Sequence, residues 1–470
     1  MKTYQDLLAV GNDEKNRKDF VRSLIDEHKG SADYRIAKDA YEYYRHKNVT
    51  INKYQKLLYE ATGRAVPDNF SADFKMACRH FHRFITQEVS YLLGNGVSWN
   101  NKETSDKLGT RRLSFDRQLI NAAKKALWGK VAFGFYDKDH VEVFSYLEFA
   151  PLYDEMNGSL MAGVRFWQID ANKPLRATLY EVDGFTKYVY NNEGTTALDE
   201  PKRFYIQKAV GTEADGMELY DERNYPTFPI IPLWANSEHQ SELIGLREQI
   251  DCYDLIKSGF ANTVDEASMF YWTIQNAGGM DDVDLNNFVQ HMRTVHAAVV
   301  DQNGATAESH TLEAPYESRE ALLERLDKDL YKDAMALDTE RISGGAVTAT
   351  QIRAAYENLN AKCDDFEYQV LDFVEGIMAV AGVDDEPTFT RSILVNQEET
   401  ANLVLQAASY LTEDYVTTKV LELLGDGDKA EEMLKQIGAD ELERITLEDE
   451  DGLRTRSNGQ EAEETGEQNT

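Results

Sequence analysis

The sequence predicts an α+β protein that is mainly helical, in which one β-rich block is enclosed between helical segments. Two patterns and the chain length predict this class. Apolar residues recur every three or four positions before about residue 125 and in several segments after residue 237, as in helices buried along one face. Between residues 130 and 235, short β-branched and aromatic runs alternate with polar turns, as in antiparallel hairpins. The chain of 470 residues also exceeds the roughly 250–300 residues that one core supports, so several structural regions are expected.

The composition restricts the function. Hydrophobic residues make up 42% of the chain and aromatic residues 11%, which is enough for a sizeable core and argues against general disorder. The 83 acidic residues outnumber the 50 basic residues, for a formal net charge of −33. Because binding of nucleic acid depends on clustered Lys and Arg, so acidic a chain is expected to bind nucleic acid poorly, and any interaction with DNA would be passage rather than adhesion.

The cysteines and the start of the chain predict where the protein folds. Cys78, Cys252 and Cys363 are far apart, form no Cys-x-x-Cys pair and are odd in number, so no disulfide framework is expected. No apolar run follows the first charged residues, and no apolar stretch approaches the ~20 residues of a membrane-spanning helix. We therefore expect a protein that folds in a reducing cytoplasm, with no signal peptide and no membrane contact.

Helices are predicted in the first 125 residues. Two runs keep helical spacing: Tyr34, Ala37, Ala40, Tyr41 and Tyr44, and then Phe74, Ala77, Phe81, Phe84, Ile85 and Val89. The second run ends in Gly94-Asn95-Gly96, which is a typical helix stop.

The β-rich block is predicted to form hairpins and to end at a proline-rich boundary. The expected strands are Val131–Tyr136, Val141–Ser145, Gly163–Ile169, Arg176–Glu181, Thr186–Tyr190 and Arg203–Gln207. Pro226, Pro229 and Pro232 then exclude both a helix and a central strand.

Helices are expected again after this boundary. The predicted order is a helix over 237–267, a mixed segment over 269–315 with β-like stretches at 270–274 and 295–300, and a helix over 316–338. Ser237 and Gln240 have the spacing of a capping box, which sets the expected start of the first helix.

A glycine-rich break over residues 339–347 precedes the strongest periodic signal of the chain. Thr348 and Gln351 form another possible capping box, and Gly382 marks the expected end of the helix over 348–382. Its apolar positions are Ile352, Ala355, Leu359, Cys363, Phe366, Val370, Phe373 and Ile377. Their repeat suits a coiled-coil seam, but burial along one stripe within the chain is favoured. A helical region is expected over about 398–444, and residues 446–470 are expected to form a disordered acidic tail.

No catalytic, metal-binding or cofactor-binding motif is found in the sequence. His80 and His82 are two residues apart and would point to different faces of a helix, and His291 and His296 lack the spacing of a zinc-binding helix. There is no phosphate-binding Gly-x-x-x-x-Gly-Lys-Ser/Thr loop and no Gly-x-Ser-x-Gly elbow. Adjacent carboxylates are numerous, but in so acidic a chain such pairs arise by chance and indicate solvated surfaces, not a metal site. The sequence therefore predicts a protein that is not an enzyme and has no cofactor.

The chain resembles the phage portal proteins of the SPP1 type over roughly residues 30 to 445. The resemblance lies in the order and spacing of several segments. They are Asp39–Arg45 with Asn48–Ile51, Phe81–Thr86 leading to Tyr91–Val97, Trp128–Phe133, Phe228–Leu233, Ser241–Leu243 and Ile250–Asp254. Cys252-Tyr253 departs from the Ala-Tyr expected there, and the segment over 269–315 matches poorly.

The resemblance implies a portal fold with named parts. By this mapping residues 1–235 form the wing, the helices over 237–267 and 316–338 form the stem, and residues 269–315 form the clip. Residues 339–347 become the tunnel loop, 348–382 the long wing helix, and 383–445 the helical crown. Pro229 and Pro232 would form a hinge between wing and stem.

The resemblance also implies the function and the partners. The chain would form a ring of about twelve copies with itself at one capsid vertex, as a channel for double-stranded DNA. The terminase large subunit would bind during packaging, and a head-completion adaptor would bind later through the clip. The major capsid and scaffolding proteins would surround the ring. The protein would be assembled in the host cytoplasm and would then be part of the virion.

The tunnel loop is the candidate site for contact with DNA. The resemblance implies that its DNA-facing residues are Arg341, Ser343, Gly344, Gly345, Val347 and Thr348. The two glycines would give the backbone freedom, and Arg341 would touch phosphate transiently. From the residues alone, a plain turn between helices is the favoured interpretation. Two other functions stay open at this point: a helical oligomeric scaffold that does not contact DNA, and a divalent-metal nuclease.

Overall fold

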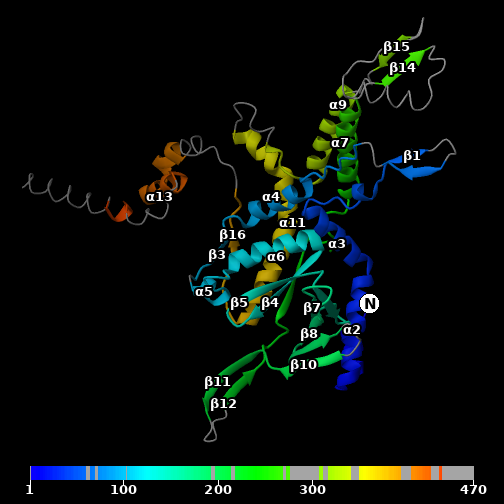
Figure 1. Cartoon of the computed structure of the whole chain (residues 1–470). Helices are drawn as coiled ribbons and strands as arrows, with labels where there is room; N and C mark the ends of the chain where they lie inside the picture. Colours follow the sequence, from blue (N-terminus) through cyan, green and yellow to red (C-terminus); the bar gives the residue numbers. More distant parts are fainter. Residues whose placement is uncertain are drawn as a thin grey trace, which may run out of the picture. The chain divides into compact units, whose positions relative to one another are not determined.

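The computed structural model of the chain describes residues 2–59, 64–68, 72–101, 103–191, 196–212, 218–267, 271–275, 306–310, 316–339, 349–392, 404–424 and 433–436. The chain divides into two units. The first consists of Met1–Thr339 and Tyr356–Ser392, and the second consists of Glu340–Ala355 and Ile393–Thr470. The described residues combine helices with antiparallel sheets, in agreement with the α+β prediction (Figure 1). None of their helices has the length and apolar character needed to cross a membrane.

Three capped helices begin the first unit. They are α1 (Tyr4–Val10), α2 (Glu14–Gly30) and α3 (Ala32–Tyr44). The side chains of Thr3, Asp13 and Ser31 accept hydrogen bonds from the first turns, which satisfies amides that a helix leaves free. Helix α3 ends where His46 takes a positive φ of 64°, so that Lys47 N donates to Glu42 O at 2.9 Å.

The next segment contains short strands and three helices. The elements are η1 (Ile51–Lys53), β1 (Leu57–Tyr59), β2 (Ala65–Pro67), α4 (His80–Leu93), β3 (Val97–Ser98), α5 (Glu103–Leu108) and α6 (Phe115–Gly129). The prediction that helical structure begins near Phe74 was wrong. Residues 72–79 are not helical, and Phe74 is 53% exposed.

The β-rich block forms a five-stranded antiparallel sheet in the order β10-β9-β8-β7-β6 and a three-stranded sheet in the order β13-β4-β5. The strands are β4 (Val131–Asp137), β5 (His140–Ser145), β6 (Phe149–Tyr153), β7 (Leu160–Trp167), β8 (Leu175–Glu181), β9 (Gly184–Tyr190), β10 (Thr196–Arg203) and β13 (Ile230–Trp234). A separate hairpin joins β11 (Ile206–Thr212) to β12 (Glu218–Arg223). The predicted hairpins are confirmed, but the strand expected over Arg203–Gln207 was wrong because the chain turns between β10 and β11.

Strand β13 shows how the sheet accommodates the proline-rich boundary. Pro232 lies within β13 and is paired in register with Phe133 of β4. Because β13 is at the edge of its sheet, the missing amide of Pro232 breaks no internal ladder. The exclusion of a central strand was therefore correct, and an edge strand was missed.

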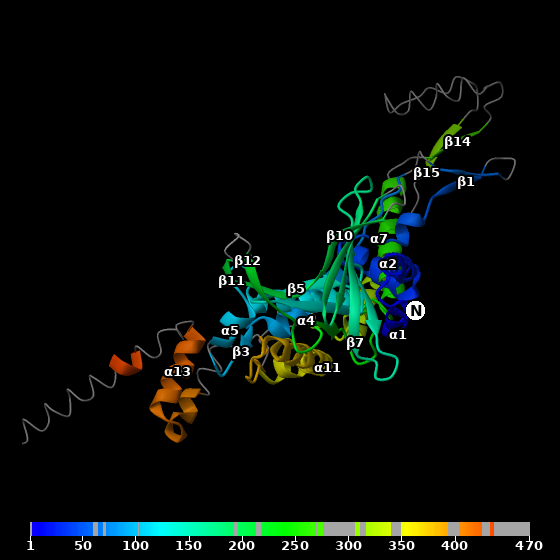
Figure 2. The ribbon, with the colours of Figure 1, turned by 90° about the horizontal axis from the view of Figure 1, so that it is seen from below.

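Two hydrophobic clusters hold the first unit together. One cluster joins α3, α4 and α6 to the three-stranded sheet and to α11 (Ala349–Ala381). A Cβ on Gly134 would lie 2.5 Å from Phe373 Cζ, so glycine in β4 allows α11 to pack closely against the sheet. The second cluster joins α1 and α2 to the five-stranded sheet, beside which both helices are seen in Figure 2.

The first helix after the boundary begins later than predicted. Helix α7 spans Arg247–Ala267, and residues 237–246 form turns instead of the expected first turns of the helix. Ser237 does not cap it: Ser241 Oγ donates to Trp128 O at 2.7 Å, and Gly245 takes a positive φ of 88°. These contacts hold the segment against α6.

The segment after α7 contains a hairpin and a second helix. Strands β14 (Tyr271–Gln275) and β15 (Thr306–His310) pair antiparallel, so the β-like stretch at 270–274 is confirmed within one residue. The stretch at 295–300 lies outside the described residues. Helix α9 spans Tyr316–Asp333, five residues short of the predicted end. The positive φ of 53° at Met335 ends it, with Ala336 N donating to Tyr331 O at 2.9 Å.

Helix α11 agrees closely with its prediction. It ends before Gly382, whose φ is +67°, as expected of a glycine at a helix end. Six of the predicted apolar positions are buried within the chain: Leu359, Cys363, Phe366, Val370, Phe373 and Ile377. Burial along one stripe is therefore confirmed for these positions. Ala355 is exposed, and Tyr356 is buried next to it.

The remaining described elements are β16 (Thr388–Phe389), which pairs with β3, and η2 (Ala408–Tyr410) and α13 (Glu413–Leu424) of the second unit. The DNA-facing candidates Arg341, Ser343, Gly344, Gly345, Val347 and Thr348 lie outside the described residues, as does the tail over 446–470.

Candidate functional site at the junction of helices α4, α7, α9 and α11

Helices α7 and α9 lie side by side in the first unit (Figure 1). The rings of Phe260 and Tyr316 are 5.6 Å apart, and Arg319 Nη1 donates to Thr263 Oγ1 at 2.7 Å. The last turns of α7 therefore contact the first turns of α9, and the two helices are antiparallel.

A ladder of buried polar side chains on α7 holds the extended segment before α4. The backbone amides of alternate residues donate to these side chains. Cys78 N donates to Asp254 Oδ1 at 2.8 Å, Met76 N to Ser258 Oγ at 3.0 Å, and Phe74 N to Asn262 Oδ1 at 2.8 Å. Four residues of a helix rise about 6.0 Å and two extended residues about 6.7 Å, so the two repeats stay in step. This ladder explains why residues near Phe74 are extended, since their amides bond to α7 instead of to a helix of their own.

Asp254 has a second partner that fixes the turn after α3. Asn48 Nδ2 donates to Asp254 Oδ2 at 2.8 Å, and Asn48 Oδ1 accepts from the amides of Thr50 and Ile51. Burial raises the pKa of Asp254, although the hydrogen bonds from Asn48 and Cys78 oppose the shift. The Asp254 carboxyl thus links three separate segments.

Helix α4 binds α9 and the residues that follow it. His80 Nε2 lies 2.7 Å from Asp327 Oδ1, and Arg83 donates to the Tyr331 hydroxyl. The Gln87 amide bonds the backbone of Leu337 twice, donating to its carbonyl at 2.8 Å and accepting from its amide at 2.9 Å. His80, Arg83 and Gln87 are three and four residues apart, so all three point from one face of α4.

Helix α4 also binds the other side of the predicted tunnel loop. Tyr91, one turn after Gln87, donates to Asn360 Oδ1 of α11 at 2.5 Å and stacks on Tyr356 at 5.3 Å between ring centroids. The segment between Leu337 and Tyr356 is therefore attached at both ends to adjacent turns of α4. Leu337 precedes the predicted tunnel loop by two residues, and Tyr356 follows it by nine.

A buried cation connects α11 to α4 and to the turns before α7. Lys362 Nζ lies 2.8 Å from Glu88 Oε2 and 2.7 Å from Glu242 Oε2. Burial lowers the pKa of Lys362, but the two carboxylates outweigh it and raise the pKa above its ordinary value. Burial raises the pKa of Glu88, with Lys362 opposing this shift and Glu242 adding to it. We call Lys362, Glu88 and Glu242 the acidic cluster, because its carboxylates outnumber its cation.

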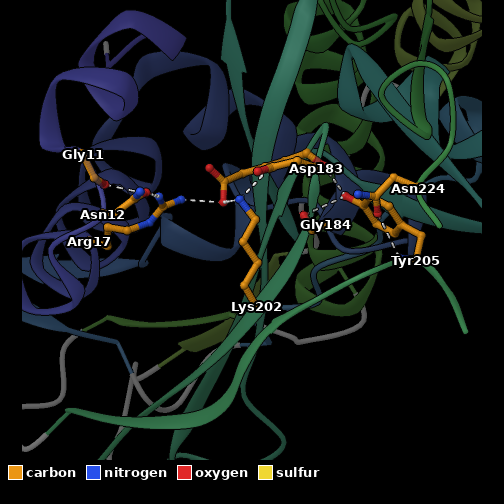
Figure 3. A network of polar contacts seen from close by, with 9 residues as sticks. Gly11, Asn12, Arg17, Asp183, Gly184, Lys202, Tyr205 and Asn224 are labelled. Atoms are coloured by element: carbon orange, nitrogen blue, oxygen red, sulfur yellow. Dashed lines mark hydrogen bonds and ion pairs between the residues drawn. The ribbon is translucent and has the colours of Figure 1, made fainter. Parts of the chain in front are cut away.

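A second ion cluster has the opposite composition. Arg17 and Lys202 both pair with the carboxylate of Glu181, the last residue of β8, and Figure 3 shows Arg17, Lys202 and Asp183 in this network. Arg17 Nη2 lies 2.5 Å and Lys202 Nζ 3.2 Å from Glu181 Oε2, and Lys202 also lies 2.5 Å from Asp183 Oδ1. The Tyr205 hydroxyl donates to the Glu181 carbonyl at 2.6 Å. We call Glu181, Arg17 and Lys202 the basic cluster.

The prolines assigned to a hinge have defined positions. Pro229 is buried, and its carbonyl accepts from Tyr136 N at 3.0 Å, while Pro232 is within β13. A Cβ on Gly376 would lie 2.7 Å from Ile231 Cγ2, so α11 packs against this strand. The hinge itself stays a prediction.

The residues of the junction were not found from the sequence, although signals for them exist. Lys362 is the one basic residue between Arg353 and Arg391, next to a position of the apolar stripe. Asp254, Ser258 and Asn262 repeat every four residues on α7. Within the described part of the chain, no group of three or more His, Cys, Asp and Glu side chains could hold a metal ion.

Comparison with known proteins gives a family for this fold. Residues 24–450 match the family model of the phage portal protein, SPP1 Gp6-like. The chain is 24% identical to the portal protein of Bacillus phage SPP1 over 423 residues, which cover 83% of this chain and 80% of that protein. It is 22% identical to the portal protein of Clostridium phage phiCD119 over 234 residues, or 48% of this chain, and so spans only 51% of that relative.

Solved structures that resemble the chain come from gene transfer agent particles. A chain in the neck of an empty gene transfer agent particle, computed with C6 symmetry, has a TM-score of 0.44 at 10% identity, covering 74% of this chain and 90% of that one. A chain in the neck of the native particle, computed with C12 symmetry, has a TM-score of 0.42 at 10% identity, covering 73% and 89%. The family match extends over most of the sequence, and the chain therefore belongs to the SPP1 Gp6-like family of phage portal proteins.

Proposed function

We propose that this chain assembles into a ring of about twelve copies that forms the DNA channel at one vertex of a phage capsid. The channel serves genome packaging, head-to-tail joining and DNA ejection. The observation that carries this proposal is the family match over residues 24–450, together with a relative covered over 80% of its length. The family is structural rather than catalytic, and the chain acts as a conduit whose energy comes from a separate ATPase.

The parts of the ring follow the order of elements along the chain. Residues 1–235 form the wing, α7 and α9 the stem, the segment between them the clip, and residues 383–445 the crown. The antiparallel pairing of α7 and α9 supports the stem assignment, because the chain runs out along one helix and returns along the other. The clip binds the terminase large subunit during packaging and the head-completion adaptor afterwards. Capsid and scaffolding proteins surround the wing in the assembling particle and the virion.

The charge of the chain suits a channel through which DNA slides. Duplex DNA carries about one negative charge per 1.7 Å of its axis, and each copy of this chain carries a formal charge of −33. An acidic lumen repels phosphate weakly, over a screening length of about 8–10 Å at physiological salt. The DNA is thus kept from adhering to the wall.

Electron microscopy of the purified protein tests the ring. The expected images show rings with an axial channel wide enough for duplex DNA. A compact monomer, or an assembly without a central hole, would refute the proposed function.

The tunnel loop over residues 339–347 is the proposed point of contact with moving DNA. Its attachment to adjacent turns of α4 through Gln87 and Tyr91 supports this role, because a loop with fixed ends can move without disturbing the ring. We expect replacement of Gly344 and Gly345 by bulky residues to leave ring assembly intact and to impair DNA packaging or retention in a phage assembly assay. Normal packaging by this variant would remove the loop from the proposal.

A further inference from the structure

A groove of about 510 Å³ runs along α7 in the first unit. Leu255, Gly259 and Thr263 of α7 line it at intervals of four residues, and Leu322 of α9 and Lys56 line it as well. Leu255 is 42% exposed and Leu322 is 45% exposed. The walls are fixed in place, since Arg319 bonds Thr263 and Lys56 Nζ donates to Ala72 O at 2.8 Å.

Gly259 is unusual for a residue in the middle of a long helix. A Cβ placed on it would meet nothing within 4 Å, and its φ does not require glycine. Glycine weakens a helix interior more than any residue except proline, so its presence here has no explanation within the described fold. A glycine in an open groove does allow another helix to approach the backbone closely.

The opposite side of the helix pair has complementary features. Val264 is five residues after Gly259 and Glu320 is two residues before Leu322, so both point away from the groove at about 100° per residue. Val264 is 45% exposed, and Glu317 and Glu320 are exposed. One side of the pair thus has apolar walls with the cations Lys56 and Arg319, and the other side has an apolar side chain with carboxylates.

We propose that the groove along α7 receives the Val264 side of the same helix pair from a second copy of this chain. Complementary surfaces on opposite sides make a head-to-tail contact, which closes into a ring when the rotation between copies allows it. The inference rests on the ring proposed above and adds to it the surface by which neighbours meet. Gly259 is the residue that admits the neighbour, and Glu317 and Glu320 of that neighbour face Lys56 and Arg319.

The first test fills the groove in the full-length protein. Because a Cβ on Gly259 would enter open space, the variants Gly259→Ala and Gly259→Met should fold. Their thermal unfolding midpoints should equal or exceed that of the unchanged protein. We expect Gly259→Met to reduce the fraction of rings in electron micrographs roughly tenfold or more, because overpacking is repeated at every contact of the ring. Gly30→Met is the matched control: Gly30 ends α2, is exposed and also has nothing within 4 Å, so its variant should form rings normally.

The second test joins the two surfaces covalently, which keeps the proposal testable if Gly259→Met should misfold. Leu255→Cys and Val264→Cys are combined with Cys252→Ser, because Cys252 is exposed and would react as well. The two new thiols are nine residues apart on opposite sides of α7, too far to bond within one chain. Mild oxidation should give a ladder of linked copies, whereas each single-cysteine variant should stop at dimers.

The outcomes separate this inference from the proposed function. If the unchanged protein forms rings and the folded Gly259→Met variant forms them equally well, the proposed interface is wrong and the channel stands. The same holds if the unchanged protein forms rings but the double-cysteine variant gives no ladder of linked copies. An unchanged protein that forms no ring would overturn the channel and the interface together.

Discussion

The acidic cluster and the basic cluster both join distant elements through three ionised side chains, but their net charges have opposite sign. Each places three ionised side chains in one contact between elements that are far apart in sequence. In the acidic cluster one cation lies between two carboxylates, and in the basic cluster one carboxylate lies between two cations. Each cluster therefore has one charge in excess, and the surroundings decide what that excess costs.

The surroundings differ in access to water. The Glu88 side chain is 2% exposed and Lys362 14%, whereas Lys202 is 35% exposed and also pairs with Asp183, which is 71% exposed. The excess cation of the basic cluster is thus screened by solvent and by a fourth side chain. In the acidic cluster Glu242 is 17% exposed and accepts only a neutral amide donor from Asn236 Nδ2 at 3.0 Å, and the raised pKa of Glu88 results from its own burial and from the nearby Glu242 carboxylate.

This contrast assigns different roles to the two contacts. The basic cluster fastens α2 to the five-stranded sheet, and loss of the pairing of its most exposed member, Lys202, can be compensated by water. The acidic cluster joins α4, α11 and the turns before α7, and α4 also holds Leu337 and Tyr356, which flank the proposed tunnel loop. A change of charge there should affect the junction as a whole, because a buried charge without a partner is strongly destabilising.

Removal of the central cation should have the largest effect. Lys362→Met leaves Glu88 and Glu242 buried together, and loss of one partner of a buried ion pair costs about 3–5 kcal/mol. We expect a loss of this size in the free energy of unfolding, measured from urea transitions of the purified protein. Lys328→Met is the control, since Lys328 forms an exposed pair with Glu324 and its loss should cost less than about 0.5 kcal/mol. Equal effects of the two variants would show that burial does not decide the outcome.

Removal of the central carboxylate of the basic cluster should have a smaller effect. Glu181→Gln keeps the shape of the side chain and leaves Arg17 and Lys202 without their shared partner. Lys202 can still pair with Asp183 and with water, so only Arg17 is left as a buried cation without a carboxylate partner. We expect a loss of about 2 kcal/mol in the same urea measurement. A loss as large as that of Lys362→Met would contradict the screening described above.

The pH dependence of stability should differ between the clusters. The raised pKa of Glu88 means that the folded protein keeps a proton after the unfolded chain has lost it. The stabilisation from this carboxyl is therefore complete below the ordinary glutamate pKa of about 4.3 and decreases as pH rises toward the folded value. Glu88→Gln should remove a decrease on the order of 1 kcal/mol between about pH 4.5 and pH 8. The exposed Glu103 provides the control variant, Glu103→Gln, which should keep the slope of the unchanged protein. An unaltered slope in Glu88→Gln would show that Glu88 is ionised throughout.

Much of the fold could be predicted because it depends on local pattern. The end of α11 at Gly382 and its buried stripe follow from helical spacing and a glycine stop, and most hairpins follow from alternation and turns. The errors arise where distant residues override local preference. The segment near Phe74 has helical spacing, but its amides bond to α7, which is some 180 residues away in the chain. Ser237 has the spacing of a cap, but Ser241 and Gly245 shape that segment instead.

The candidate site was less predictable for the same reason. The tunnel loop was assigned by resemblance, and its residues from 340 to 347 lie outside the described part of the chain. The residues that hold its ends could not be assigned, because Gln87 and Leu337 are 250 residues apart and a single glutamine has no characteristic pattern. Lys362 was overlooked because a charged residue beside an apolar stripe is usually solvated, and only the positions of Glu88 and Glu242 show that it is not.

Removal of the excess cation should have the smallest effect and distinguishes the clusters most directly. Lys202→Met reduces the basic cluster to the single pair of Arg17 and Glu181, which is its most buried pair. Since Lys202 is 35% exposed, its contribution is that of a surface ion pair, and we expect a loss of about 0.5 kcal/mol or less at low salt. Salt near 1 M shortens the screening length to about 3 Å, so this loss should vanish, whereas the loss in Lys362→Met should persist because its cluster is enclosed. Thermal unfolding of both variants at low and high salt measures this difference. If salt abolished both losses, water would reach the acidic cluster as well, and the junction would be no more enclosed than the surface contact.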